Sequence, residues 1–134
     1  MLESNQIKYL IIHCSDTDNI DINNASHIHK MHIGFGWDGI GYHKIICKDG
    51  LIEDGRPEYW VGAHAYGYNH KSLGVCLIGK NEFTDDQFDS LFKLLKLWKS
   101  KYPNTRIIGH KDTATSKTCP NFDVLSWCKE RNLN

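Results

Sequence analysis

The stretch IKYLIIHCS at residues 7–15 predicts a buried strand that ends in residue types able to bind metals. Residues 7–13 are rich in branched and aromatic side chains, which is typical of a buried strand, and a polar loop follows at residues 14–24. A second continuous apolar run, LGVCLIG at residues 73–79, also indicates a strand. Because such runs are buried on both faces, we expect an α/β architecture in which helices flank a mixed central β-sheet.

The other elements are predicted by turn residues, helix caps and apolar periodicity. A short helix begins at Asn24, with Ile28, Met31 and His32 on one face and Gly34 at its end. A last helix spans about Phe122–Arg131, with Val124 and Trp127 or Cys128 facing inward. The remaining predictions are strands at Tyr42–Lys48, Leu51–Glu53 and Thr105–Gly109, with a turn at Asp49–Gly50. The irregular, glycine-rich and aromatic residues 55–72 form a long loop, which in a compact domain tends to be a binding surface.

The clearest helix is predicted at residues 84–101. Thr84 and Gln87 form a capping-box pattern at its start, and Pro103 marks its end. Between them, apolar residues recur with helical spacing at Phe88, Leu91, Phe92, Leu95 and Trp98. This pattern indicates an amphipathic helix with one face packed on the core.

Length and charge limit the classes of protein to which the chain can belong. Its 134 residues predict one domain, residues 1–134. The 16 basic and 16 acidic residues cancel, so the chain lacks the electrostatic footprint of a nucleic-acid-binding protein or of one bound to an anionic membrane. No apolar run reaches the ~18 residues of a membrane span, and MLESNQIK lacks a secretory pattern, so we expect synthesis in the cytosol.

Histidine is unusually frequent, at 8 of 134 residues, and two of these histidines end strands. His13 and His110 converge if their strands present them at the same rim of one sheet, and Cys119 follows nine residues after His110. Two histidines and one cysteine suit Zn²⁺ with a fourth position open to water, which is the catalytic type of site. Cys14 is a poor fourth ligand, because neighbouring strand residues point to opposite faces. Spacing alone leaves open that these are ordinary core and surface residues.

Five motifs, in order along about residues 7–127, resemble the zinc-dependent N-acetylmuramoyl-L-alanine amidases of type 2. They are HCS at 13–15, GWDGIGYHKIICKDG at 36–50, EDGRPEYWVGAHAYGYNHKSLGVCLIG at 53–79, GHKD at 109–112 and KTCPNFD at 117–123. These amidases share their fold with the peptidoglycan recognition proteins, and the chain is most similar to the small amidase-type endolysins of tailed phages. Several independent blocks in the same order make this resemblance specific.

The resemblance implies roles for eight residues. His13, His110 and Cys119 match the ligands of one zinc ion per chain. Tyr42 and Lys117 match the two catalytic residues that flank the metal, and Trp37, His64 and Asn69 match residues that line the peptidoglycan groove. The general base stays open, with Asp112 as a candidate for proton handling or for support of the ligands.

The implied activity is hydrolysis of the amide bond between N-acetylmuramic acid and L-alanine, with peptidoglycan or muropeptides as substrate. We expect a monomeric phage or prophage endolysin that is made in the cytoplasm and acts on the cell wall, in the periplasm, after release. The alternatives are a peptidoglycan-binding protein, a polymerase-regulating protein with a protein partner, a secreted amidase toxin, a cytosolic recycling amidase, and a closed structural zinc protein.

Overall fold

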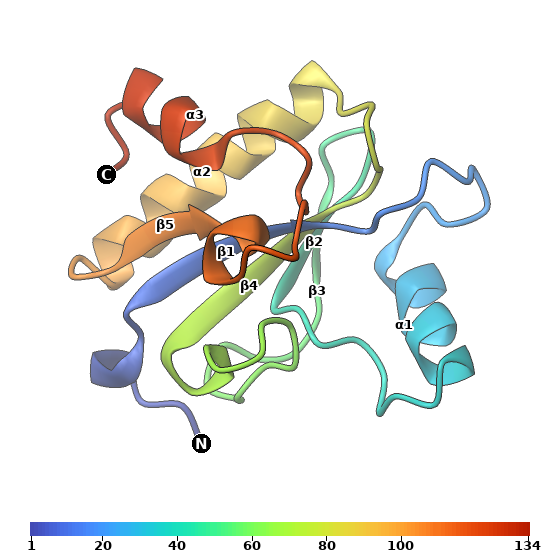
Figure 1. Cartoon of the computed structure of the whole chain (residues 1–134), viewed down its shortest axis with the longest axis horizontal. Helices are drawn as coiled ribbons and strands as arrows, with labels where there is room; N and C mark the ends of the chain where they lie inside the picture. Colours follow the sequence, from blue (N-terminus) through green and yellow to red (C-terminus); the bar gives the residue numbers. More distant parts are fainter.

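A five-stranded sheet organises the computed structural model, which describes all residues 1–134. The strands are β1 (Tyr9–Cys14), β2 (Lys44–Ile46), β3 (Ile52–Asp54), β4 (Ser72–Leu77) and β5 (Arg106–Gly109), and the helices are α1 (Ala25–Gly34), α2 (Asp85–Lys101) and α3 (Val124–Glu130). The strand order is β3-β2-β4-β1-β5, with only the β2–β3 pair antiparallel (Figure 1). The predicted mixed sheet with flanking helices is confirmed.

Strand β1 is hydrogen-bonded on both sides, to β4 and to β5, and its side chains alternate between the two faces of the sheet. Leu10 and Ile12 point to one face, which we call the apolar face. Ile11 and His13 point to the other face. The β4 residues on that face are Ser72, Gly74 and Cys76, of which Gly74 lies in register with Ile11 and Cys76 with His13. We call this second side the histidine face.

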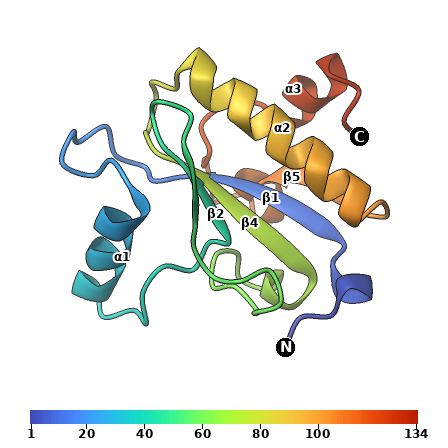
Figure 2. The ribbon, with the colours of Figure 1, turned by 180° about the vertical axis from the view of Figure 1, so that it is seen from behind.

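The apolar face is covered by α2 and α3 (Figure 2). Helix α2 begins as the sequence predicts, with Thr84 as N-cap and a reciprocal capping box to Gln87. Leu91, Leu95 and Trp98 of α2 are fully buried against the strands in the main apolar cluster. Burial of this kind stabilises by about 25 cal/mol per Å² of apolar surface, so this layer provides most of the stability.

The histidine face is covered mainly by irregular chain rather than by helices. Residues 55–71 cross it, and the short 3-10 turn His110–Thr113 lies on the same side (Figure 1). Helix α1 packs Ile28 on the β2 side of this face, against Ile45 and Cys76. None of the helices combines the length and the apolar character that a bilayer span requires.

Two local predictions differ from the structure. Asn24 caps α1 as predicted by accepting from the His27 N–H, but the helix runs through Gly34, and Gly36, with φ +86°, is the glycine that takes the left-handed conformation. Strand β2 is shorter than the predicted Tyr42–Lys48. The pairing ends before the Asp49–Gly50 turn, where Gly50 takes φ +88°.

Candidate metal centre and active-site cleft

His13, His110 and Cys119 converge at the carboxyl end of the β1–β5 pair. His13 lies near the end of β1, and His110 directly follows β5, which is the parallel neighbour of β1. The ring centroids of the two histidines are 4.4 Å apart. One ligand atom from each of the three residues lies within 4.8 Å of the others. The predicted convergence of these side chains is therefore present.

The donor set fits a zinc ion. Two imidazole nitrogens and one thiolate sulfur are ligands that Zn²⁺ prefers, and these three residues offer such a set within 4.8 Å. Burial, followed by the charges of His64 and His110, lowers the pKa of His13, so its imidazole is in the neutral form that ligates. The group of possible ligands has three members, and Cys14 is not one of them.

The sulfur of Cys119 is held against the end of β1. The backbone N–H of Cys14 donates to Cys119 Sγ over 3.0 Å, an interaction that favours the thiolate. In the opposite direction, the hydrogen bond with the Cys14 side chain and burial raise the pKa of the Cys119 thiol. Ligation requires the thiolate, so metal binding at this position is expected to release a proton.

His13 also contacts His64. The Nε2 atom of His13 and the Nδ1 atom of His64 share a hydrogen bond of 2.8 Å, and both rings are buried. Burial, with the charges of His43, His110 and Arg56, lowers the pKa of His64 to about 3. Its ring is therefore neutral, and its polar atoms point to protein groups. His64, which is predicted to line the groove, lines the cleft beside the donors and also contacts His13, a predicted metal ligand.

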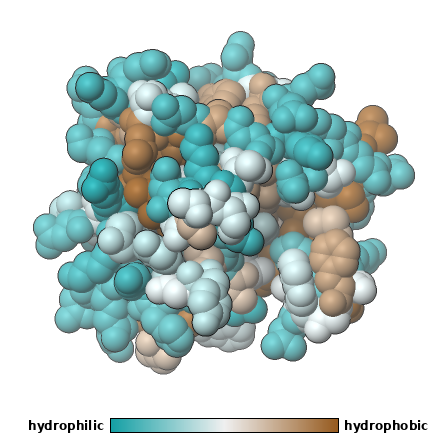
Figure 3. Space-filling view, in the orientation of Figure 1, coloured by the Kyte–Doolittle hydropathy of each residue, from teal (hydrophilic) through white to brown (hydrophobic).

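A cleft of about 790 Å³ opens in front of the three donors. One wall is formed by α1 and the turn after it, with the exposed side chains of Phe35 and Trp37. In the space-filling view, apolar surface lies over this helix, while most of the face is hydrophilic (Figure 3). The other walls include Tyr66, which is 98% exposed, and the loop that contains Lys117. The cleft lining combines apolar and polar side chains and so suits a ligand with apolar and polar parts.

Tyr42 and Lys117 both line the cleft beside the donors. The ring centroid of Tyr42 is 5.0 Å from that of His13. Burial, followed by the nearby cysteines, raises the pKa of Tyr42, so its hydroxyl stays a hydrogen-bond donor. Burial, followed by the charge of Lys117, lowers the pKa of His110.

Asn69 and Asp112 form hydrogen bonds with the backbone close to the site. The Asn69 side-chain oxygen accepts from the N–H groups of His64 and Ala65, each over 2.9 Å. The Asp112 carboxylate accepts from the Gly109 N–H over 2.8 Å and so holds the turn that presents His110. Both residues therefore shape the site through the backbone, although Asn69 also lines the cleft.

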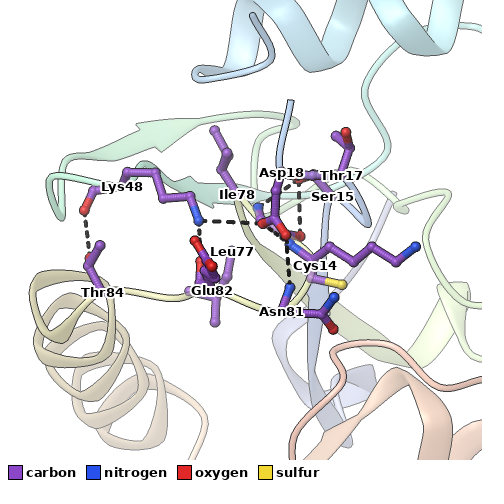
Figure 4. A network of polar contacts seen from close by, with 12 residues as sticks. Cys14, Ser15, Thr17, Asp18, Lys48, Leu77, Ile78, Asn81, Glu82 and Thr84 are labelled. Atoms are coloured by element: carbon purple, nitrogen blue, oxygen red, sulfur yellow. Dashed lines mark hydrogen bonds and ion pairs between the residues drawn. The ribbon is translucent and has the colours of Figure 1, made fainter. Parts of the chain in front are cut away.

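The loop after β1, which lines one end of the cleft, is fastened to the chain between β4 and α2 (Figure 4). The Asp18 carboxylate accepts from the N–H groups of Lys80 and Asn81, and Lys48 forms an ion pair with Asp18 and donates to the Glu82 carbonyl. These bonds hold the chain leaving His13 in place.

The sequence did not identify the polar partners of His13. His64 is 51 positions away from it, and Ser72, whose side chain contacts His64, was assigned no role. One signal was available: Gly74 lies within an apolar strand pattern, and an isolated glycine in a strand often marks a close approach of another group. Here that group is the His64 ring.

Comparisons with known proteins agree with this architecture. The protein-family model for N-acetylmuramoyl-L-alanine amidases matches residues 3–122. The endolysin of Enterobacteria phage T3 is 39% identical over 132 residues, which cover 92% of this chain and 87% of that protein. The solved structure of the endolysin N-acetylmuramoyl-L-alanine amidase LysCS from Clostridium intestinale URNW has a TM-score of 0.84 at 33% identity, covering 100% of this chain and 90% of that one. The peptidoglycan recognition protein PGRP-SA of Apis mellifera has a TM-score of 0.78 at 29% identity, covering 92% and 82%.

Proposed function

The chain belongs to the N-acetylmuramoyl-L-alanine amidase family, and from this premise we propose that its activity depends on a zinc ion held by His13, His110 and Cys119. It is a phage endolysin that hydrolyses the amide bond between N-acetylmuramic acid and L-alanine in peptidoglycan. We further propose that residues 1–134 act as one monomeric amidase domain.

One observation supports the zinc proposal above all others. Three side chains from distant parts of the sequence, two imidazoles and a thiol, bring their donor atoms within 4.8 Å at the base of a cleft. A set of three protein ligands leaves one position for water or substrate, which is the catalytic rather than the structural type of zinc site. This argues against the closed structural alternative.

The metal supplies Lewis-acid polarisation of the amide carbonyl and a water molecule acidified to a pKa near 7. The protein residues bind and orient the substrate. We propose that Lys117, which lines the cleft, donates to the oxygen of the amide carbonyl as negative charge develops on it, an interaction typically worth about 3–4 kcal/mol. In the same proposal the Tyr42 hydroxyl holds the attacking water or passes a proton to the departing amine.

The cleft walls favour a substrate that combines sugar and peptide. Trp37 and Tyr66 present exposed aromatic rings, which suit the apolar faces of sugar units, and Lys117 suits peptide carbonyls. We propose that Trp37 and Asn69 contact peptidoglycan and that the enzyme, made in the cytoplasm, acts in the periplasm. Binding of a regulatory protein partner would be an additional function of the same domain.

A chelation experiment tests the zinc proposal. The purified protein is treated with a chelator, its zinc content is measured, and the release of new L-alanine amino termini from purified sacculi is followed. Activity is expected to disappear with the metal and to return on addition of Zn²⁺. The fold is expected to survive, because His13 and His110 lie at strand ends and the Cys119 carbonyl accepts from the Lys111 N–H over 2.7 Å. Full activity of metal-free protein would overturn the proposal.

A further inference from the structure

The hydrogen bonds behind His13 have a direction that the structure determines. Their starting point is the Tyr68 carbonyl, which can only accept. Ser72 Oγ lies 2.7 Å from this oxygen and donates its single hydrogen to it. The Ser72 hydroxyl therefore has only lone pairs left for its second neighbour, His64 Nε2, at 3.3 Å.

The next two steps follow from the proton count of a neutral imidazole. Such a ring has one N–H and one bare nitrogen. Because Ser72 can only accept, the N–H of His64 is on Nε2 and its Nδ1 is bare. The bare Nδ1 of His64 therefore accepts from its other neighbour, His13 Nε2, at 2.8 Å. His13 then has its proton on Nε2, and its Nδ1 lone pair is free.

The series of hydrogen bonds that runs from Tyr68 through Ser72 and His64 to His13 is largely buried, although His13 and His64 also line the cleft. Ser72 is 0% exposed, His13 1% and His64 9%. A Cβ at Gly74 would lie 2.6 Å from His64 Nδ1, and one at Gly62 would lie 2.6 Å from His64 Cδ2, so both glycines are required for the ring to lie here. The Asn69 side chain holds the backbone of His64 from the other side.

We infer that His64 and Ser72 are positioning residues, which fix the tautomer and orientation of His13 so that its Nδ1 atom faces the metal. This inference rests on the proposed function, in which His13 is a zinc ligand. Partners that orient a metal-binding histidine through its second nitrogen typically contribute about 10–100-fold in metal affinity. His64 thus acts through His13.

His43 offers a matched control. It is a second buried histidine on the same face, with its ring centroid 5.7 Å from that of His64. Its Nδ1 accepts from the Gly74 N–H over 3.1 Å, and its Nε2 donates to the Trp60 carbonyl over 2.8 Å. Replacement of His43 should cost about as much packing and hydrogen bonding as replacement of His64. Unlike His64, His43 contacts none of the three proposed ligands.

The first test reads the tautomers directly. Nitrogen-15 NMR of the imidazoles in the metal-free, wild-type protein is expected to show protonated Nε2 and bare Nδ1 for both His13 and His64. This measurement needs no variant and no activity. A proton on Nδ1 of His13 would overturn the inference even if the wild type binds zinc and cleaves sacculi.

The second test compares zinc affinity, measured by competition with a chromophoric chelator, with unfolding by urea. His64→Leu is expected to weaken zinc binding about 10–100-fold, whereas His43→Leu loses similar stability and keeps wild-type affinity. His64→Asn, whose side-chain oxygen can lie where Nδ1 lay, is expected to recover most of the loss. Equal zinc affinities for His64→Leu and the wild type, or equal losses in both leucine variants, would overturn the inference. If the wild type itself binds no zinc, the proposed function fails, whatever the NMR result.

Discussion

The two faces of the central sheet are built from the same strands and carry opposite kinds of side chain. On the apolar face, Leu10 and Ile12 of β1 pack with the side chains of α2 and α3 in one apolar cluster. On the histidine face, Ile11 and His13 lie beside Ser72 and Gly74 of β4, and the covering chain is irregular. A shift of one residue along a strand changes the face to which a side chain belongs.

This difference separates stability from chemistry. Regular helices can bury an apolar surface efficiently, but they leave little freedom in placing polar groups. The irregular residues 55–71 can bend to bring His64 onto Gly74 and against His13, and they satisfy their backbone groups through side chains such as Asn69. We therefore expect changes on the apolar face to affect unfolding, and changes on the histidine face to affect zinc and catalysis.

The largest effect is expected from Cys119→Ser. Loss of the thiolate removes one of three proposed ligands, so amidase activity is expected to fall on the order of 10⁴-fold or more, as when one member of a catalytic unit is removed. The free energy of unfolding should change by less than about 1 kcal/mol, because Cys119 is only half-buried.

Cys128→Ser is the matched control for that variant. Cys128 is 0% exposed in the apolar cluster, so a serine there is expected to cost about 1–3 kcal/mol in unfolding free energy and to leave zinc content unchanged. Sacculus assays and urea unfolding of both variants separate the two results. Retained activity in Cys119→Ser would contradict the proposal that the histidine face provides the chemistry and the apolar face the stability.

The next effect is expected from Leu95→Ala on the apolar face. Leu95 is 0% exposed, and a cavity at such a position costs about 2–5 kcal/mol. Leu97→Ala, on the same helix at 60% exposure, is expected to be nearly neutral. Zinc affinity at a temperature where both variants are folded should equal that of the wild type. A large change in affinity for Leu95→Ala would show that the faces are coupled.

A smaller loss is expected from Lys117→Met. Removal of a donor to the developing oxyanion typically lowers kcat about 10²–10³-fold, and zinc content should stay intact because Lys117 ligates nothing. Lys129→Met, an exposed lysine on α3, is the control. Steady-state kinetics on soluble muropeptides measure the effect. A change in KM alone would assign Lys117 to substrate binding instead of transition-state stabilisation.

The sequence predicted the apolar face more completely than the histidine face. Continuous apolar runs located β1 and β4, and a capping box with helical spacing located α2, because these are local properties of the chain. The residue types and strand ends proposed the three donors, and the resemblance made this assignment specific, since their spacing alone is weak evidence. The His13–His64 bond joins residues 51 positions apart and depends on how irregular chain folds over a glycine, which no local pattern encodes.

The smallest expected effect tests a contact that joins the coverings of the two faces. Burial opposes ionisation of Glu58, but hydrogen bonds from Lys101 and Tyr102, over 2.9 and 2.7 Å, outweigh it and lower the pKa of this carboxyl. A pKa that is lower in the folded than in the unfolded chain stabilises the fold above the unfolded value of about 4.3, and the stabilisation is lost as the pH falls through the folded value.

Glu58→Gln removes the charge while keeping the shape of the side chain. Because the pair is partly exposed, the variant is expected to lose less than about 1 kcal/mol of unfolding free energy at pH 7, and the difference should shrink as the pH falls below the unfolded pKa of about 4.3. Urea unfolding across this range measures it, with the exposed Glu130→Gln as the control. Zinc affinity should not change, because Glu58, Lys101 and Tyr102 do not line the cleft that contains the donors. A difference that persists at low pH would mean that Glu58 acts through packing and not through its charge.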